Sequence, residues 1–422
     1  MSETIRFTNG YLAQADGTAI IGDLYISKAT GKIISGQSEF FSTLQSPSRV
    51  VDLKGKLLSP GLIDVQINGA YGVDFSELDI TSLDGGEGAY IRGLEKVARK
   101  IVETGCTSFV PTIITQRFEL YAKLLRLLQP RSAPASANSL GYHAEGPFLN
   151  PLRRGAHNDT LLLTANSSSP IDSFDEVYGK DGLNQEGVKI LTVAPDVFGV
   201  MDSLGDLSKR GVVISIGHSD ASLEVATEAV EKNARMITHL FNAMPSLHHR
   251  DPGVIGLLGA AIERPFYGII ADGLHSHPNT VRIAYGAFKD GCILVTDAMS
   301  MLDPQLPDGI HHWREGISFR KEGLRVVLDG TNTLAGSAIT LCECVKNLST
   351  FAGIPLPEAL LCATSHPAIM LGGDVARTKG KLEVGMDADL AVFTWDGKVV
   401  STWVAGLEVF GSLSGEQTAN GH

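Results

Sequence analysis

The sequence has little cysteine, and the spacing of its cysteines argues against a zinc finger. Only 5 of the 422 residues are cysteine. Cys342 and Cys344 form a Cys-x-Cys pair, and no pair has the spacing of a metal finger. Scattered cysteines of this kind are typical of reduced thiols in a cytosol, so we expect a cytoplasmic protein.

The sequence also lacks a segment that would carry it into a membrane. The first residues, Met1 to Arg6, have neither the basic stretch nor the apolar stretch of a signal peptide. No run of about 18 consecutive apolar residues occurs, the length that is needed to span a bilayer. We therefore expect a soluble intracellular protein.

Positive charge is in deficit. Lysine and arginine number 35 against 47 aspartates and glutamates, for a net charge of -12 at pH 7. This balance argues against nucleic acid or an anionic membrane as a partner, whereas a small anion could still bind through local cations. A Gly-x-x-x-x-Gly-Lys phosphate loop is also missing, and the glycines of residues 253–259 lack the spacing of a dinucleotide fingerprint.

What is present is a series of buried strands that alternate with helical segments. Hydrophobic residues make up 43% of the chain. Continuous apolar runs, rather than alternating ones, indicate parallel strands covered on both faces. The predicted strands span residues 62–68, 107–114, 139–145, 189–194, 212–218, 236–241, 267–272 and 292–297. Helices are predicted over residues 90–103, 118–128 and 222–232, and a loop-like insertion over residues 164–185. The fold class that we expect is α/β, a (β/α)8 TIM-like barrel, with a doubly wound open sheet as the alternative.

Both ends of the chain are rich in short strands separated by turn residues such as Asn9-Gly10. Neither end is long enough to fold alone, so we expect the two to pair. The prediction is a small discontinuous β-sandwich domain, formed by residues 1–59 and 377–422, beside a barrel catalytic domain of residues 60–376.

Polar side chains gather where the predicted strands end. Glu145 ends one strand and is followed by Gly146-Pro147, which stops the strand. His218 and His239 end two later strands. In a barrel these ends meet at one mouth, and one carboxylate with two imidazoles suits a divalent transition metal. Further polar groups at strand ends are Gln66, Asn68, His275 and Asp297. Taken singly, each histidine could be structural and Asp297 could cap a turn.

These motifs resemble the amidohydrolase superfamily and, within it, the N-acetylglucosamine-6-phosphate deacetylase family. The resemblance is carried by the stretches 143–148, 217–219, 238–244 and 271–275, and by Ser59-Pro60-Gly61 before the first barrel strand. It implies hydrolysis of N-acetylglucosamine 6-phosphate to glucosamine 6-phosphate and acetate, in amino-sugar catabolism. Gln66-Ile67-Asn68 stands where many members of the superfamily have His-x-His. We therefore expect one ion per chain, bound by Glu145, His218 and His239: Zn²⁺, with Fe²⁺, Co²⁺ and Mn²⁺ as alternatives. A second, weaker ion near Gln66 stays an open alternative.

The resemblance also implies roles for other residues. Asp297 is the general base and then the general acid. His157, beside Ala156, lies against the substrate carbonyl, or else on the surface as a loop residue. His275 contacts the sugar. The phosphate is bound by the backbone of Asn242 and Ala243 and by Arg250, whose loop reaches a neighbouring subunit in the family, so we expect a homodimer. Leu334, Ala335 and Gly336 form a substrate-contacting loop; alternatively, the following Ser337 caps a helix.

Two other functions are weighed against this one. A different hydrolase of the superfamily could act on a cyclic amide or on another acyl-amino sugar. A barrel without catalysis would have lost its ligands, whereas all four of the central polar residues, Glu145, His218, His239 and Asp297, are present.

Overall fold

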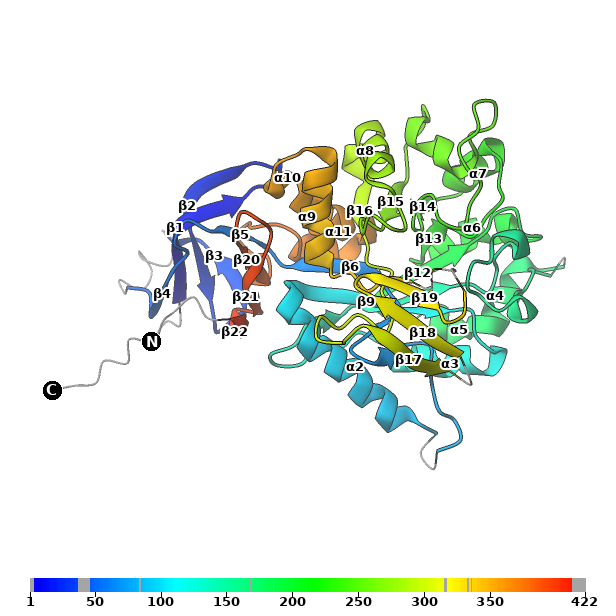
Figure 1. Ribbon diagram of the computed structural model, residues 1–422, viewed down its shortest axis with the longest axis horizontal. Helices are drawn as coiled ribbons and strands as arrows, with labels where there is room; N and C mark the ends of the chain where they lie inside the picture. Colours follow the sequence, from blue (N-terminus) through cyan, green and yellow to red (C-terminus); the bar gives the residue numbers. More distant parts are fainter. Residues whose placement is uncertain are drawn as a thin grey trace.

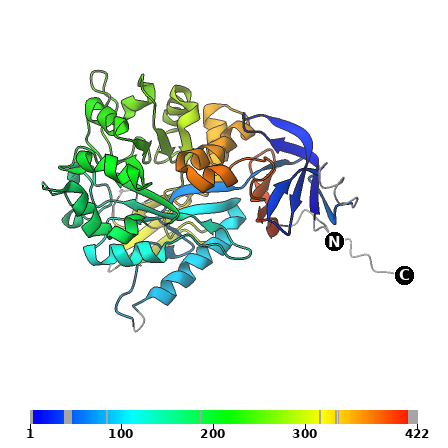
Figure 2. The same cartoon turned by 180° about the vertical axis from the view of Figure 1, so that it is seen from behind.

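The structure, a computed structural model, describes residues 4–36, 46–82, 85–166, 168–184, 186–314, 317–331, 334 and 336–411. It has two parts that lie side by side, a barrel and a smaller sheet (Figures 1 and 2). The sheet contains strands from both ends of the chain, and the barrel contains the segment between them. The predicted fold class is confirmed. The exact division at residues 60 and 377 stays a prediction.

The barrel consists of parallel strands in the order in which they occur along the chain. Its eight strands are β6 (Leu62–Ile67), β9 (Cys106–Ile114), β11 (Gly141–Glu145), β12 (Val188–Val193), β13 (Val213–Ile216), β14 (Ala234–Ile237), β15 (Phe266–Ile269) and β16 (Cys292–Leu294). The short strand β10 (Asn138–Ser139) adds to β9. Each predicted strand overlaps one of the eight.

The barrel closes where the chain after β16 returns to β6. Ile67 and Ala298 form a parallel bridge, and the amide of Asp297 donates a hydrogen bond of 2.9 Å to the carbonyl of Gln66. Closure removes the exposed edges that an open sheet would leave. It also brings the first and last strands together, so that residues about 230 positions apart share the barrel mouth.

Helices surround the barrel (Figure 1). They are α2 (Glu87–Ile101), α3 (Phe118–Leu127), α4 (Pro170–Tyr178), α5 (Lys180–Asn184), α6 (Val200–Lys209), α7 (Leu223–Glu231), α8 (Pro278–Ala287), α9 (Leu341–Ala352), α10 (Leu356–Leu361), α11 (Ser365–Leu371) and α12 (Gly373–Thr378). The loop expected over residues 164–185 is therefore wrong, because α4 and α5 occupy most of it. None of the helices in the described ranges combines the length and the apolar character that a membrane crossing requires.

The smaller part is one sheet of eight strands. They are β1 (Thr4–Ala13), β2 (Ala19–Ser27), β3 (Lys32–Ile34), β4 (Arg49–Asp52), β5 (Leu57–Pro60), β20 (Leu390–Phe393), β21 (Val399–Val404) and β22 (Leu407–Gly411). β5 joins the two ends of the chain, since it pairs with β1 and with β20. The sheet has its own hydrophobic core, in which Phe7 and Trp403 make an edge-to-face contact at 5.0 Å.

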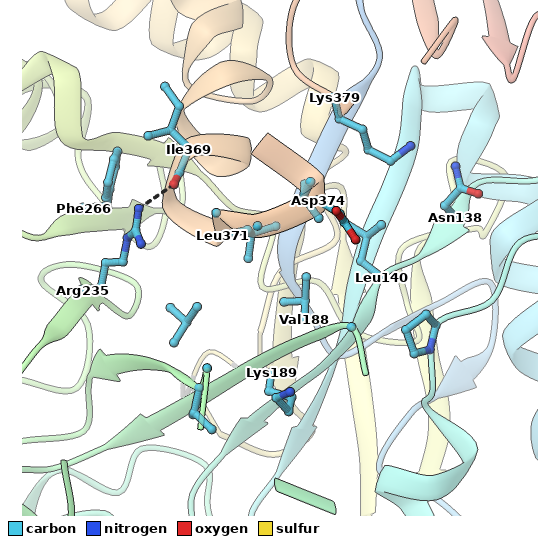
Figure 3. Close-up of a pocket in the computed structure, with 18 of the residues that line it drawn as sticks. Asn138, Leu140, Val188, Lys189, Arg235, Phe266, Ile369, Leu371, Asp374 and Lys379 are labelled. Atoms are coloured by element: carbon cyan, nitrogen blue, oxygen red, sulfur yellow. Dashed lines mark hydrogen bonds between the residues drawn. The ribbon is translucent and has the colours of Figure 1, made fainter. Parts of the chain in front are cut away.

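Lys379, whose side chain is only 10% exposed, lies where the smaller sheet meets the barrel and lines the pocket shown in Figure 3. Lys379 Nζ lies 2.9 Å from Asp387 and 2.5 Å from Asp389, just before β20. Asp389 also accepts a hydrogen bond of 3.3 Å from Asn138 in β10. These groups line a cavity of about 1490 Å³ at the end of the barrel where the strands begin.

A second small sheet, absent from the sequence predictions, follows β16. It consists of β17 (Gly309–Arg314), β18 (Ile317–Glu322) and β19 (Arg325–Leu328), which pair antiparallel. Ser337 follows it and does not cap a helix: its hydroxyl donates to the carbonyl of Thr296 at 2.5 Å. The helix cap is Thr340, which forms a capping box with Glu343 at the start of α9.

Candidate metal centre and active site

Three of the predicted residues meet at the barrel mouth. Glu145 is the last residue of β11, and His218 and His239 follow β13 and β14 by two residues each. The Nε2 atoms of His218 and His239 lie 2.9 and 3.0 Å from Oε1 of Glu145, and 3.1 Å from each other. All three side chains are buried. Their ligand atoms are therefore close enough to share one ion.

The backbone has an unusual conformation at the two histidines that follow β13 and β14. φ is 49° at His218 and 25° at His239, and the same left-handed region recurs at Asp297 with φ 47°. Residues other than glycine avoid this region, and they keep it only where the surrounding structure holds them there. The turns aim the side chains into the mouth instead of continuing the strand alternation.

The hydrogen bonds of the triad indicate that the buried carboxylate of Glu145 needs a positively charged partner. His218 Nδ1 lies 2.8 Å from the carbonyl of Arg153, so it must carry a hydrogen, and in the neutral ring Nε2 then presents a lone pair to Glu145. Burial disfavours charge on His239, yet the adjacent carboxylate raises its pKa to about 9. A divalent ion would supply this positive charge instead and would displace the additional proton from His239. The donor set of one carboxylate and two imidazoles thus fits such an ion.

Asp297 lies beside this triad and is held by two amides of the first strand region. Asn68 Nδ2 donates a hydrogen bond of 2.7 Å to Asp297 Oδ1. Gln66 Nε2 lies between the two carboxylates, 3.3 Å from Asp297 and 3.4 Å from Glu145 Oε2. Burial, followed by the charge of Glu145, raises the pKa of Asp297. A carboxylate whose pKa is raised is a better proton acceptor, as general base catalysis requires.

His157 is buried against the triad. Its ring lies 4.5 Å from that of His218. The amide of Thr115 donates to Nδ1 of His157 at 3.2 Å, so Nδ1 is the acceptor and Nε2 carries the hydrogen. Burial lowers the pKa of His157 to about 3. The ring is therefore neutral, and a surface position for His157 is wrong; its neighbour Ala156 lies on the exposed loop.

His275 is oriented by a carboxylate. Its Nδ1 donates to Asp272 Oδ2 at 2.6 Å, and Oδ1 of Asp272 accepts the amides of Leu274 and His275. Burial opposes ionisation of Asp272, but the hydrogen bond and charge of His275 lower its pKa overall. With Nδ1 occupied, Nε2 of His275 is the atom that is available to a ligand.

The expected phosphate contacts lie on the segment after β14. Phe241 and Ala243 have φ values of 76° and 52°, and Asn242 directs Nδ2 to the carbonyls of His239 and Leu240. Arg250 lies further along on an exposed loop. Among the described residues, none forms a hydrogen bond or ion pair with its guanidinium, and no contact joins Arg250 to the triad.

The expected substrate loop is described only in part. Leu334 forms a bridge with Val327 of β19, and Gly336 has φ 75°. A Cβ at Gly336 would lie 2.4 Å from Cγ of Met299, so only glycine fits there. Ala335 lies outside the described residues.

Sequence reasoning missed the residues that fix proton positions in the site. Thr115 sets the tautomer of His157, and it carries no sequence signal because a threonine directly after a strand is common. Asp272 could have been found, since it stands in the same short motif as His275. Burial lowers the pKa of His143 to about 4, so this strand histidine two residues before Glu145 is also neutral.

Comparison with known proteins agrees with this geometry. Residues 57–409 match the amidohydrolase family. The N-acetylglucosamine-6-phosphate deacetylase of Caenorhabditis elegans is 38% identical over 414 residues, covering 97% of this chain and 95% of that protein. The human deacetylase of the same name is 37% identical over 410 residues, covering 96% and 95%. The crystal structure of the Pasteurella multocida deacetylase superposes with a TM-score of 0.78 at 29% identity, covering 96% of this chain and 99% of that one. The chain therefore belongs to the amidohydrolase family and, within it, to the N-acetylglucosamine-6-phosphate deacetylases.

Proposed function

We propose that this enzyme hydrolyses the acetamide of N-acetylglucosamine 6-phosphate, releasing glucosamine 6-phosphate and acetate. The observation that carries the proposal is the convergence of Glu145, His218 and His239 within reach of Asp297. An amide is a poor electrophile, so its hydrolysis needs an activated water and a polarised carbonyl. A divalent ion, when bound, supplies both effects. We assign Glu145, His218 and His239 as its ligands and Zn²⁺ as the ion.

Asp297 moves the proton. The hydrogen bond from Asn68 to Oδ1 keeps the carboxylate turned into the mouth, and Oδ2 is the oxygen on which we place the transferred proton. Asp297 takes the proton from the attacking water and then delivers it to the departing amine nitrogen. The raised pKa of Asp297 favours the first of these steps.

His157 acts on the carbonyl oxygen of the substrate. Because Thr115 holds its Nδ1 as an acceptor, Nε2–H is the donor that faces the site. A fixed donor stabilises the negative charge that develops on the oxygen as the water attacks. The neutral ring is suited to this role, because its tautomer already carries a hydrogen on Nε2.

We assign the remaining predicted residues to the sugar and to its phosphate. We assign His275 Nε2 to a sugar hydroxyl, and the backbone of Ala156 and of residues 334–336 to the rest of the substrate. The amide of Asn242 donates a hydrogen bond of 3.0 Å to the carbonyl of His239, so within this turn we assign the amide of Ala243 to the phosphate. The unpaired guanidinium of Arg250 is a suitable partner for phosphate oxygens. We also propose a homodimer in which the exposed loop of Leu247 and Arg250 contacts the second subunit.

The experiment that tests the reaction compares substrates at equal concentration. The purified chain is given N-acetylglucosamine 6-phosphate, the unphosphorylated sugar, another N-acyl amino sugar phosphate and a cyclic amide, and acetate or amine release is followed. We expect the phosphorylated N-acetyl sugar to be hydrolysed with the highest kcat/KM. Preference for the cyclic amide would instead support a different hydrolase of the family.

A further inference from the structure

A row of hydrogen-bonded side chains crosses the barrel interior just beneath the metal centre. His143 of β11, Thr192 of β12, Ser215 of β13 and Thr238 after β14 form this row, which we call the polar layer. Nε2 of His143 lies 2.7 Å from the Thr192 hydroxyl, which lies 2.6 Å from that of Thr238, and Ser215 follows at 2.6 Å. None of the four is exposed to solvent.

The hydrogens of the polar layer can be assigned in one direction. His143 Nδ1 lies 3.1 Å from the carbonyl of Val65, which can only accept, so Nδ1 carries the hydrogen. In the neutral ring Nε2 accepts from Thr192, Thr192 accepts from Thr238, and Thr238 accepts from Ser215. Three hydroxyl hydrogens then meet three acceptors. The reverse direction would leave the Ser215 hydroxyl without an acceptor among the described residues.

Each member of the polar layer is tied to a strand that carries a ligand. His143 precedes Glu145 by two residues, and Thr192 is paired with Glu145 in the strand register. Ser215 lies three residues before His218, and Thr238 directly precedes His239. Val65 belongs to the first strand, next to Gln66. The row thus joins the first strand to those that bear Glu145, His218 and His239.

The contact with His218 runs through Gly217. A Cβ at Gly217 would lie 2.7 Å from Cγ2 of Thr192 and 2.7 Å from Cβ of Thr238. The strand end that turns into His218 therefore rests directly on two members of the polar layer. Because His218 and His239 both have strained left-handed backbone, something must hold them there, and the layer is in place to do so.

The adjacent interior of the barrel shows that hydroxyls are not needed for packing. Toward the start of the strands an apolar cluster includes Ile63, Val110, Ile190 and Ile293. Replacing both members of a hydrogen-bonded threonine pair with valines, which have the same shape, changes the stability of a fold little when only packing matters.

We propose that the polar layer positions Glu145, His218 and His239 for metal binding, with Thr192 as its key positioning residue. The proposal deepens the proposed function and rests on the metal centre assigned there. It predicts that metal affinity depends on a hydroxyl at position 192 that touches neither the ion nor the substrate.

The test measures the affinity of the chain for Zn²⁺ by competition with a chelator, and the visible absorption spectrum of the Co²⁺-substituted chain. Thr192→Val removes the hydroxyl at nearly constant volume, and Thr192→Ser restores it. Thr402→Val is the matched control, because Thr402 is equally buried in β21 and donates 2.7 Å to the carbonyl of Val102, far from the barrel mouth. Thermal unfolding of the metal-free chain reports general damage to the fold.

We expect Thr192→Val to weaken Zn²⁺ binding about 10-fold or more and to alter the Co²⁺ spectrum, while Thr192→Ser and Thr402→Val stay near wild type. The melting temperature of the metal-free chain should fall in Thr192→Val, because His143 Nε2 and the Thr238 hydroxyl lose their partner, but the chain should remain folded at the temperature of the binding assay. Ser215→Ala, which removes only the last donor of the row, should weaken binding several-fold, and it decides the matter if Thr192→Val does not fold.

Unchanged Zn²⁺ affinity in Thr192→Val or, should that variant not fold, in Ser215→Ala would overturn the inference, as would an equal loss in Thr402→Val. These outcomes leave the metal centre intact. A wild-type chain that binds no ion at the triad would overturn the proposed function itself, and the two failures are therefore distinguishable.

Discussion

Asn68 donates a hydrogen bond of 2.7 Å from its Nδ2 to Oδ1 of Asp297. The two residues come from opposite ends of the barrel sequence, and closure of the barrel at Ile67 and Ala298 brings them together. Asn68 takes the place of a histidine that many members of the superfamily carry on the first strand. Because an amide is a weak ligand for a zinc-like ion, we propose that Asn68 instead holds the carboxylate that we assign as the general base.

Replacing Asn68 with alanine should move the acidic limb of the pH dependence of kcat to higher pH. The hydrogen bond from Asn68 lowers the pKa of Asp297 against burial and the charge of Glu145, which raise it. Asp297 must be ionised to act as a base, so losing the donor leaves less of the active form at a given pH. The pH profile of acetate release measures this effect. Asn184→Ala, which removes an exposed amide, is the control and should leave the profile in place.

Replacing Asp297 with asparagine should cut kcat by roughly 10²-fold or more, because the proton acceptor is lost. Metal content should stay unchanged, since Asp297 is not among the three ligands that we assign. Asp290→Asn, on the exposed side of the barrel, serves as a control with normal turnover. Near-normal turnover in the Asp297 variant would show that another group carries the proton.

The sequence predicts much of this arrangement for one physical reason. Parallel strands end at the same mouth, so polar residues that close separate apolar runs must meet there. This reasoning predicts that Glu145, His218 and His239 lie together, and the structure brings them together. The barrel follows from the same runs, because continuous apolar strands need cover on both faces.

Other features depend on information that is not local in the sequence. The composition of residues 164–185 indicates a loop, although proline is common at the first position of a helix, where α4 begins with Pro170. The eight predicted strands complete a barrel by themselves, so the barrel pattern does not predict the additional sheet β17–β19. Thr192 and Ser215 look like ordinary strand residues, because a hydrogen bond between strands depends on register, which single residues do not reveal.

Replacing Arg250 with alanine should raise KM for the phosphorylated sugar by about 10-fold to 100-fold and change KM for the plain sugar little. A charge-assisted contact with phosphate is worth about 1.5–3 kcal/mol, and the plain sugar cannot make it. Steady-state kinetics on both sugars measure the difference. Arg92→Ala, which removes an exposed arginine of α2, is the matched control. Equal increases for both sugars would count against a phosphate contact.

Replacing Lys379 with methionine should destabilise the fold by about 3 kcal/mol or more, because Asp387 and Asp389 would lose their buried partner. Lys209→Met removes an ion pair whose lysine is 81% exposed and should change stability by less than about 0.5 kcal/mol. Denaturant unfolding at neutral pH measures both. A Lys379 variant as stable as Lys209→Met would rule out a structural role for this cluster.

The same cluster predicts how stability depends on pH. Burial disfavours the charge of Asp387, but Lys379 and then Lys32 lower its pKa below the usual value. Its contribution is therefore present above the pKa of the unfolded carboxyl, about 3.9, and is lost as the pH falls through the lower folded value. Unfolding between neutral and acid pH should show this loss in the wild type, and Lys379→Met should show less of it.

The central claim is that one ion, held by Glu145, His218 and His239, supports deacetylation. The most direct test is to strip the chain with a chelator, add Zn²⁺ stepwise, and measure bound metal per chain together with acetate release from N-acetylglucosamine 6-phosphate. We predict that activity rises in proportion to bound metal and reaches its maximum at about one ion per chain, and that His239→Ala loses both. Full activity in the stripped chain, or activity that appears only with a second ion, would contradict the account.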